Sequence, residues 1–189
     1  MRVISGEAHG RRLTAPRGLH TRPATARIRA SIFSRVAARV ELEGARVLDI
    51  FAGSGSLGLE ALSRGAASVV FVDSSRAAAD AIARNLKTLG VEHRARVLVR
   101  DFRHAMAELE RAGERFDVVF VDAPYTDDRS GEVLAILTRL DLIAPQGLAV
   151  VRQFHRARAL EPADLECVNQ ATLGDHRIAL FRRPAPPRG

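Results

Sequence analysis

Short apolar runs alternate with helix-like segments over most of the chain, from Arg46 onward. The runs are rich in β-branched residues and nearly continuous in hydrophobicity, as buried parallel strands are: RVLDIFA, SVVFVD, ARVLVRD, FDVVFVD and GLAVVRQF. The segments between them carry apolar residues at helical spacing: LGLEALSRG, SRAAADAIARNLKTLG, RHAMAELERAG and SGEVLAILTRLDLI. This alternation predicts an α/β fold, with helices on both faces of a doubly wound, mostly parallel sheet.

The C-terminal part of the chain departs from this alternation. Residues 166–183, ECVNQATLGDHRIALFRR, contain two strand-like runs around Gly174-Asp175 and no helical pattern. They predict an antiparallel hairpin at one edge, which brings the sheet to seven strands. We expect the Pro-rich residues 185–189 to be a disordered tail.

The N-terminal part has a different composition from the rest. Residues 1–26 combine glycine and proline with arginine and histidine, which predicts an irregular or β-hairpin extension with little core of its own. The pattern ATARIRASIFSRVAARV then predicts a helix from about Thr25 to Val40 with one apolar face. We therefore expect a basic extension over residues 1–26 and the α/β domain over residues 27–184.

The charge of the chain is concentrated in its first quarter. Residues 1–46 contain ten arginines and three acidic residues, which accounts for the whole net charge of +7. Genomic base composition explains why Lys87 is the only lysine, but it does not explain this clustering. A localised excess of arginine predicts a polyanionic partner such as nucleic acid.

The rest of the composition restricts the class of protein. The single cysteine, Cys167, allows neither an internal disulfide nor a multi-cysteine zinc site, so we expect a reducing compartment and no metal. No segment approaches the ~20 apolar residues of a membrane span, and the N-terminus lacks the apolar core of a signal peptide. We expect a cytoplasmic protein that is a monomer and makes no membrane contact.

A glycine loop follows the first predicted strand, in VLDIFAGSGSLG at residues 47–58. Its glycines satisfy G-x-G-x-x-G, which fits either a dinucleotide or another adenosine cofactor. Asp49, however, lies four residues before Gly53, where a pyrophosphate would meet a buried negative charge. A carboxylate there suits a cationic ligand such as the ammonium group of S-adenosylmethionine, whereas the plainer alternative is an ordinary strand-to-helix turn that needs glycine.

Two further acidic residues end the next two predicted strands. Asp73 could accept both ribose hydroxyls of an adenosine cofactor, because it would lie beside the glycine loop. Asp101, followed by Phe102, could accept the adenine amino group while the ring packs on the phenyl group. An N-cap of the following helix is an equally good explanation of Asp101.

The fourth predicted strand ends in Asp122-Ala123-Pro124-Tyr125, which resembles the (D/N/S)-P-P-(F/Y/W) signature of methyltransferases acting on amino groups conjugated to a planar ring. Such a nitrogen is a poor nucleophile until hydrogen-bond acceptors draw its N–H groups out of the ring plane. The Asp122 carboxylate and the carbonyl of Ala123 can accept these bonds, while Pro124 keeps the preceding residue extended. Tyr125 can stack on an unpaired base.

These motifs, in this order, resemble the RsmD family of bacterial 16S rRNA guanine-N2 methyltransferases, with GEAHGRRLTAP and TRPATARIRASIF upstream. The resemblance implies a class I methyltransferase (Rossmann-like) fold, S-adenosylmethionine as cofactor with S-adenosylhomocysteine as product, and 16S rRNA in a 30S assembly intermediate as partner. It implies cofactor contacts from Asp49, Phe51, Ala52, Gly53, Ser54, Gly55, Asp73, Ser74, Asp101, Phe102 and Asp122. The implied RNA contacts are Arg11, Arg12, Arg22, Arg27 and Arg29.

The chain departs from the family pattern at four positions, all occupied by alanine: Ala24, Ala26, Ala30 and Ala123. Other readings therefore stay open, namely a methyltransferase for DNA adenine or a protein amide, and a non-catalytic RNA-binding relic. A nicotinamide-dependent reductase is disfavoured because Asp49 precedes the glycine loop and no catalytic Tyr-x-x-x-Lys pattern is evident.

Overall fold

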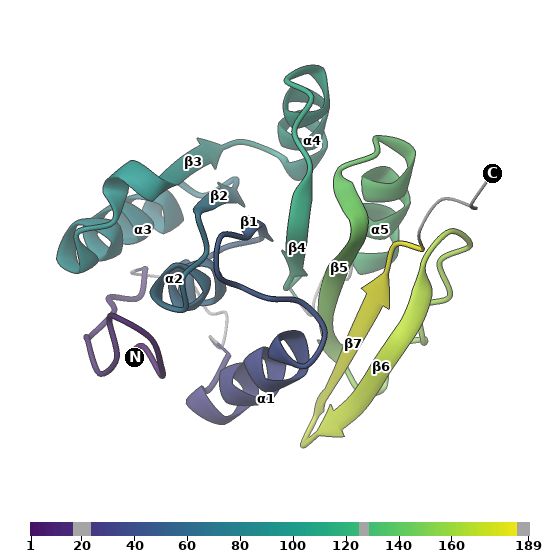
Figure 1. The fold of residues 1–189 in the computed structure, drawn as a ribbon, viewed down its shortest axis with the longest axis horizontal. Coiled ribbons are helices and arrows are strands. Elements are labelled where there is room, and N and C mark those ends of the chain that lie inside the picture. The colour runs from purple at the N-terminus through teal and green to yellow at the C-terminus, as the bar shows by residue number, and fades with distance from the viewer. Residues whose placement is uncertain (17–23, 125–128, 185–189) are drawn as a thin grey trace.

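A seven-stranded sheet of order β3-β2-β1-β4-β5-β7-β6 forms the centre of the protein (Figure 1). The computed structural model describes residues 1–16, 24–124 and 129–184, so Arg22, Tyr125 and the expected tail lie outside the described residues. The strands are β1 (Arg46–Ile50), β2 (Ser68–Asp73), β3 (Ala95–Val99), β4 (Phe116–Val121), β5 (Ile143–Phe154), β6 (Glu166–Leu173) and β7 (His176–Arg182). The expected seven strands are confirmed.

Strand direction also follows the expectation from the sequence. Strands β1 to β5 pair in parallel, whereas β7 pairs antiparallel with both β5 and β6. The order along the sheet reverses at β1, which pairs with β2 on one side and β4 on the other. In open α/β sheets, ligands bind at such a switch point, outside the carboxyl ends of the strands.

Helices cover both faces of the sheet (Figure 1). They are α1 (Ala26–Ala37), α2 (Ser56–Ser63), α3 (Arg76–Leu89), α4 (Phe102–Arg111), α5 (Ser130–Arg139) and the 3-10 helix η1 (Glu92–Arg94). Buried side chains of α1, α2 and α3 belong to one hydrophobic cluster, and those of α4 and α5 belong to a second. Among the described residues, no helix is both long and apolar enough to cross a membrane.

Local sequence explains where several helices begin and end. The Thr25 side chain caps α1 by accepting from the Ile28 N–H, and Ser75 caps α3 in the same way. Gly90 ends α3 in the left-handed conformation with φ 71°, which favours glycine. The helix expected from Thr25 to Val40 is therefore present but ends at Ala37.

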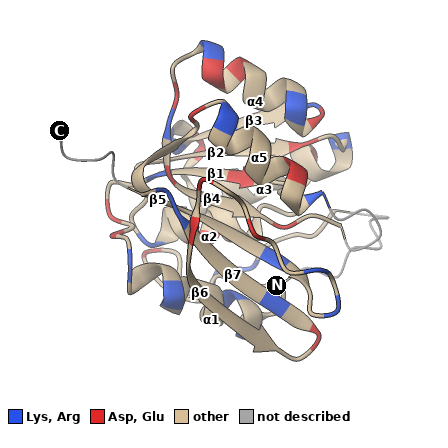
Figure 2. Cartoon of the chain, turned by 90° about the vertical axis from the view of Figure 1, so that its right-hand side faces the viewer, with Lys and Arg blue, Asp and Glu red and all other residues tan. Residues whose placement is uncertain are grey.

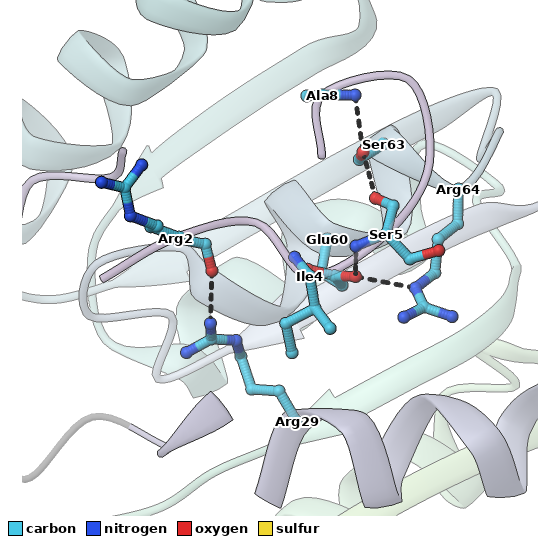
Figure 3. A network of polar contacts seen from close by, with 8 residues as sticks. All are labelled: Arg2, Ile4, Ser5, Ala8, Arg29, Glu60, Ser63 and Arg64. Carbon is cyan, nitrogen blue, oxygen red and sulfur yellow. Dashed lines mark hydrogen bonds and ion pairs between the residues drawn. The ribbon is translucent and has the colours of Figure 1, made fainter. Parts of the chain in front are cut away.

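The N-terminal extension is fixed onto α2 by hydrogen bonds between its backbone and side chains of the helix (Figure 3). The carboxylate of Glu60 accepts from the Ile4 N–H at 2.7 Å and from the Ser5 N–H at 3.0 Å. Two apolar residues of the extension, Val3 and Leu13, are buried in the same cluster as the α1 and α2 side chains. The extension is thus attached to the domain by side chains of the domain itself.

Candidate functional site

Three carboxylates meet at the switch point of the sheet. Asp49 lies in β1, Asp73 ends β2, and Asp122 directly follows β4. Parallel pairing of these strands places all three near the same carboxyl edge. Burial is the main cause that raises the pKa of Asp49, and the nearby charges of Asp122 and Asp73 add to the rise.

The glycine loop between β1 and α2 has an unusual backbone. Phe51, Gly53 and Gly55 all adopt positive φ, at 61°, 56° and 74°. Positive φ is strained for phenylalanine, and such strain collects at functional sites. A Cβ added to Gly53 would meet nothing nearer than the Phe51 carbonyl at 3.9 Å, so this face of the loop is open to a ligand.

The third glycine of the motif serves packing. A Cβ on Gly58 would lie 2.3 Å from the Phe71 ring of β2, so helix α2 can approach the sheet only with glycine at this position. The Gly58 N–H also donates to the Asp49 carboxylate at 2.9 Å. Gly58 therefore sets the distance from helix to sheet and holds Asp49 at the same time.

Asp49 is a buried carboxylate with little compensation. Its side chain is 1% exposed. Burial raises the pKa of Asp49 well above its ordinary value, the Gly58 N–H opposes this rise, and the charges of Asp122 and Asp73 add to it. A cation bound beside this group would stabilise its ionised form. The residues present therefore fit a cationic ligand such as S-adenosylmethionine.

Asp73 connects β2 to the glycine loop. One of its carboxylate oxygens accepts from the Gly53 N–H at 2.8 Å, and the other accepts from the Ser75 N–H at 2.8 Å. The neighbouring Ser74 is exposed. Asp73 thereby fixes the loop, and a carboxylate retains lone pairs for ribose hydroxyls beyond these two bonds.

A pair of phenylalanines borders the same edge. The rings of Phe51 and Phe102 are 5.2 Å apart at an interplanar angle of 57°, and the Arg103 guanidinium lies 4.6 Å from the Phe102 centroid. Phe102 is buried and Phe51 is half-buried, so only Phe51 presents part of its ring at this edge. Asp101 is the N-cap of α4, because its side chain accepts a hydrogen bond from the Arg103 N–H at 2.9 Å.

Asp122 has a partner that sequence reasoning missed. Its carboxylate forms a two-point ion pair with Arg152 of β5, with Nε–Oδ1 at 2.6 Å and Nη2–Oδ2 at 2.8 Å. The Arg152 side chain is 6% exposed and that of Asp122 is 16% exposed, so water screens the pair poorly. The available signal was an arginine inside the apolar run GLAVVRQF, because a buried charge requires a partner.

The remaining residues of the motif after β4 differ in their exposure. Ala123 is 5% exposed, whereas Pro124 is half-buried. The Asp122 N–H donates to the Ile50 carbonyl, which ties the start of the motif to β1. Tyr125, expected to stack on a base, lies outside the described residues, so its role stays a prediction.

The expected RNA contacts divide into two groups. Arg11, Arg12 and Arg27 are exposed. Arg29 is 1% exposed, and its guanidinium donates to the Ala24 carbonyl and, as Figure 3 shows, to the Arg2 carbonyl, so its assignment as an RNA contact is wrong. Burial lowers the pKa of Arg29, and the Glu60 charge opposes this. Its long stem allows it to lie on the buried side of α1 and secure the extension.

Comparison with known proteins places this chain in a family. The model of the family described as "Conserved hypothetical protein 95" matches residues 1–182. Ribosomal RNA small subunit methyltransferase D of Escherichia coli (strain K12) is 33% identical over 186 residues, which cover 98% of this chain and 91% of that protein. The chain belongs to the RsmD family.

Other members of similar length agree with this assignment. The RsmD-family chain is 34% identical to the protein YlbH of Bacillus subtilis (strain 168), over 97% of this chain and 99% of YlbH. The solved structure of yhhF from Escherichia coli superposes with a TM-score of 0.82 at 34% identity, covering 98% of this chain and 99% of that one. The class I methyltransferase fold expected from the sequence is thereby confirmed.

In this RsmD-family chain, one buried asparagine joins the N-terminal extension to the glycine loop. Asn85 of α3 accepts from the Thr14 N–H at 2.7 Å, and its amide nitrogen donates to the carbonyls of Thr14 and Ser54 at 2.9 and 3.1 Å. The Met1 sulfur lies 3.8 Å from the Ser54 hydroxyl. The sequence did not predict this connection, because it depends on contacts between residues 71 positions apart.

Proposed function

We propose that this chain uses S-adenosylmethionine to methylate the exocyclic N2 of a guanine in 16S rRNA, within a 30S assembly intermediate in the cytoplasm. The observation that carries the proposal is the Asp122 carboxylate at the carboxyl end of β4, held by Arg152 beside the glycine loop. Membership of the RsmD family and the relative named as an rRNA small subunit methyltransferase support the same substrate class.

The carboxyl edge offers suitable groups for each part of the cofactor. Asp49 faces the glycine loop from β1 and favours a cation, Asp73 is placed for ribose hydroxyls, and Phe51, packed on Phe102, suits adenine. When bound, S-adenosylmethionine supplies a methyl group activated by the positive sulfur. We infer that this cofactor, rather than a dinucleotide, occupies the edge, because three carboxylates there would repel a pyrophosphate.

The catalytic role belongs to Asp122 and to the backbone that follows it. The carboxylate and the Ala123 carbonyl accept the two N–H groups of the base amine, which frees its lone pair from the ring. As the nitrogen gains a methyl group it loses one proton, and the Asp122 carboxylate is placed to accept it. Arg152 is a positioning residue, because its two hydrogen bonds to Asp122 hold the carboxylate in one orientation.

Parallel substrate assays test the proposed function. Radiolabelled methyl transfer would be measured to 30S particles, free 16S rRNA, duplex DNA and bulk protein under the same conditions. We expect transfer to 30S particles or 16S rRNA, with N2-methylguanosine as the product nucleoside. Methyl groups found only on DNA or only on protein would identify the alternative substrates, and no transfer at all would favour a non-catalytic relic.

A further inference from the structure

The turn that follows β5 carries two exposed arginines at the carboxyl edge of the sheet. Arg156 and Arg158 are both exposed, and neither has an acidic partner within the described part of the chain. They lie four and six residues beyond Arg152, the residue that holds Asp122. Because an extended chain spans at most ~3.6 Å per residue, the Arg156 Cα lies within ~14 Å of the Arg152 Cα.

The backbone of this turn is held from two sides. The Ala157 N–H donates to the Phe154 carbonyl at 3.0 Å, which closes the turn, and the His155 N–H donates to the Asp175 carbonyl at 2.8 Å. The guanidinium of Arg177 in β7 then donates to the carbonyls of Ala157 at 2.9 Å and His155 at 2.8 Å. A turn fixed in this way presents the Arg156 side chain with little loss of backbone entropy on binding.

At the other end of the parallel strands, where their amino ends lie, the arginines have acidic partners. There, Glu114 pairs with both Arg46 and Arg96, and Asp141 pairs with both Arg115 and Arg183. Arg46, Arg96 and Arg115 near the amino ends of the parallel strands, and Arg183 after the antiparallel strand β7, are thus paired with acidic residues of the same surface. Figure 2, which looks onto the β7 and β6 side of the molecule, shows basic residues on strands there and on the adjoining loops.

The two basic regions lie on either side of Asp122. On one side, the extension that carries Arg11 and Arg12 contacts the glycine loop through Asn85 and Met1. On the other side, β5 pairs with β4 and leads directly into the turn that carries Arg156 and Arg158. A nucleic-acid strand with a base at Asp122 would therefore have cationic groups along its backbone in both directions.

We propose that Arg156 and Arg158 form a second RNA contact, binding phosphates on the β5 side of the target nucleotide while the N-terminal extension binds on the other side. The inference rests on the proposed function, since it takes RNA as the substrate. Guanidinium groups are suited to phosphate oxygens because they donate two parallel hydrogen bonds. The turn positions the strand and does not read its sequence.

The test compares two double variants with equal loss of charge. Arg156→Ala/Arg158→Ala removes the proposed contact, whereas Arg111→Ala/Arg139→Ala removes two exposed arginines near the C-terminal ends of α4 and α5. Filter binding of a 16S rRNA transcript would be measured from 50 to 200 mM salt. The slope of log K against log salt is negative, and each lost phosphate contact reduces its magnitude by ~0.7–0.9. We therefore expect the slope to become shallower by ~1.4–1.8 for the first variant only.

One outcome would exclude the second RNA contact, and another would exclude the proposed methyltransferase function. If Arg156→Ala/Arg158→Ala has the same affinity and slope as Arg111→Ala/Arg139→Ala, the second contact does not exist, although the parent can still be an rRNA methyltransferase. If the parent itself neither binds the transcript nor transfers methyl groups to 30S particles, the proposed function fails first. S-adenosylmethionine affinity, measured by calorimetry, should be equal in all three proteins, which shows that the variants are folded.

Discussion

At the scale of single residues, the site depends on two buried charges that are compensated in different ways. The Asp122 carboxylate pairs with the guanidinium of Arg152. Within the described parts of the chain, the Asp49 carboxylate accepts only from the Gly58 N–H, and it lies near two further carboxylates. A paired carboxylate keeps a fixed orientation, and a poorly compensated one is ready for a cationic ligand. Under the proposed function, Asp122 serves the substrate and Asp49 serves the cofactor.

The raised pKa of Asp49 predicts a stability that falls as pH rises. In the unfolded chain the pKa of Asp49 is near 3.8, so Asp49 loses its proton there at a lower pH than in the folded protein. The free energy of unfolding therefore falls as pH rises above the unfolded pKa, and it levels off above the folded pKa. Asp49→Asn removes this dependence and can still accept from Gly58. We expect the variant to be more stable than the parent in urea unfolding at pH 8, by a smaller margin at pH 5, and to bind S-adenosylmethionine more weakly. An equal loss of stability at every pH would contradict this.

The ion pair of Asp122 predicts coupled effects on stability. Arg152→Gln leaves a largely buried carboxylate without this partner, which typically costs ~3–5 kcal/mol in the free energy of unfolding. Asp122→Asn/Arg152→Gln removes both charges, so it should be more stable than Arg152→Gln alone. Chemical denaturation of the four proteins of the cycle measures this coupling. Strictly additive effects would show that the two side chains do not interact.

At the scale of elements, most of the sheet could be predicted because each strand is encoded locally. The apolar runs ending in Asp73 and Asp122 and the turn at Gly174 specify strands without reference to the rest of the chain. The attachment of the extension could not be predicted in this way. Glu60 and Asn85 are polar residues within helical patterns, yet each is 1% exposed. Their side chains are buried because they form hydrogen bonds with backbone groups of the distant N-terminal extension.

The same limit explains the error at Arg29. The resemblance implied that Arg29 contacts RNA, but its guanidinium donates to the carbonyls of Ala24 and Arg2 inside the protein. Arg152 was missed for the related reason that its partner lies on another strand. A sequence shows which charges stand in apolar surroundings, whereas their partners are known only once the fold brings them together.

The link through Asn85 predicts that the extension and the cofactor loop respond together. Asn85→Ala leaves the Thr14 N–H and the Ser54 carbonyl without this partner, which typically costs ~1–3 kcal/mol. We expect lower stability, faster hydrogen exchange of the Thr14 amide and weaker S-adenosylmethionine binding. Thr88→Ala, which removes an exposed side-chain bond on the same helix, is the control. If both variants have the cofactor affinity of the parent, the extension does not support the loop.

At the scale of the whole molecule, three acidic residues lie at the carboxyl ends of the parallel strands, and basic regions lie to either side of them. The carboxyl ends of β1, β2 and β4 supply the acidic residues, while the extension and the turn after β5 supply the arginines. Under the proposed function, this separation allows a single domain to hold a cationic cofactor and a polyanionic substrate at once.

Single-turnover methylation of 30S particles, with saturating cofactor and nucleoside analysis of the product, tests whether Asp122 carries the methyl transfer. The parent should yield N2-methylguanosine, and Asp122→Ala should bind S-adenosylmethionine yet lose ~10²–10³-fold in rate, the usual effect of removing one positioned hydrogen-bonding group at a reacting centre. An undiminished rate in Asp122→Ala, with cofactor binding intact, would contradict the account.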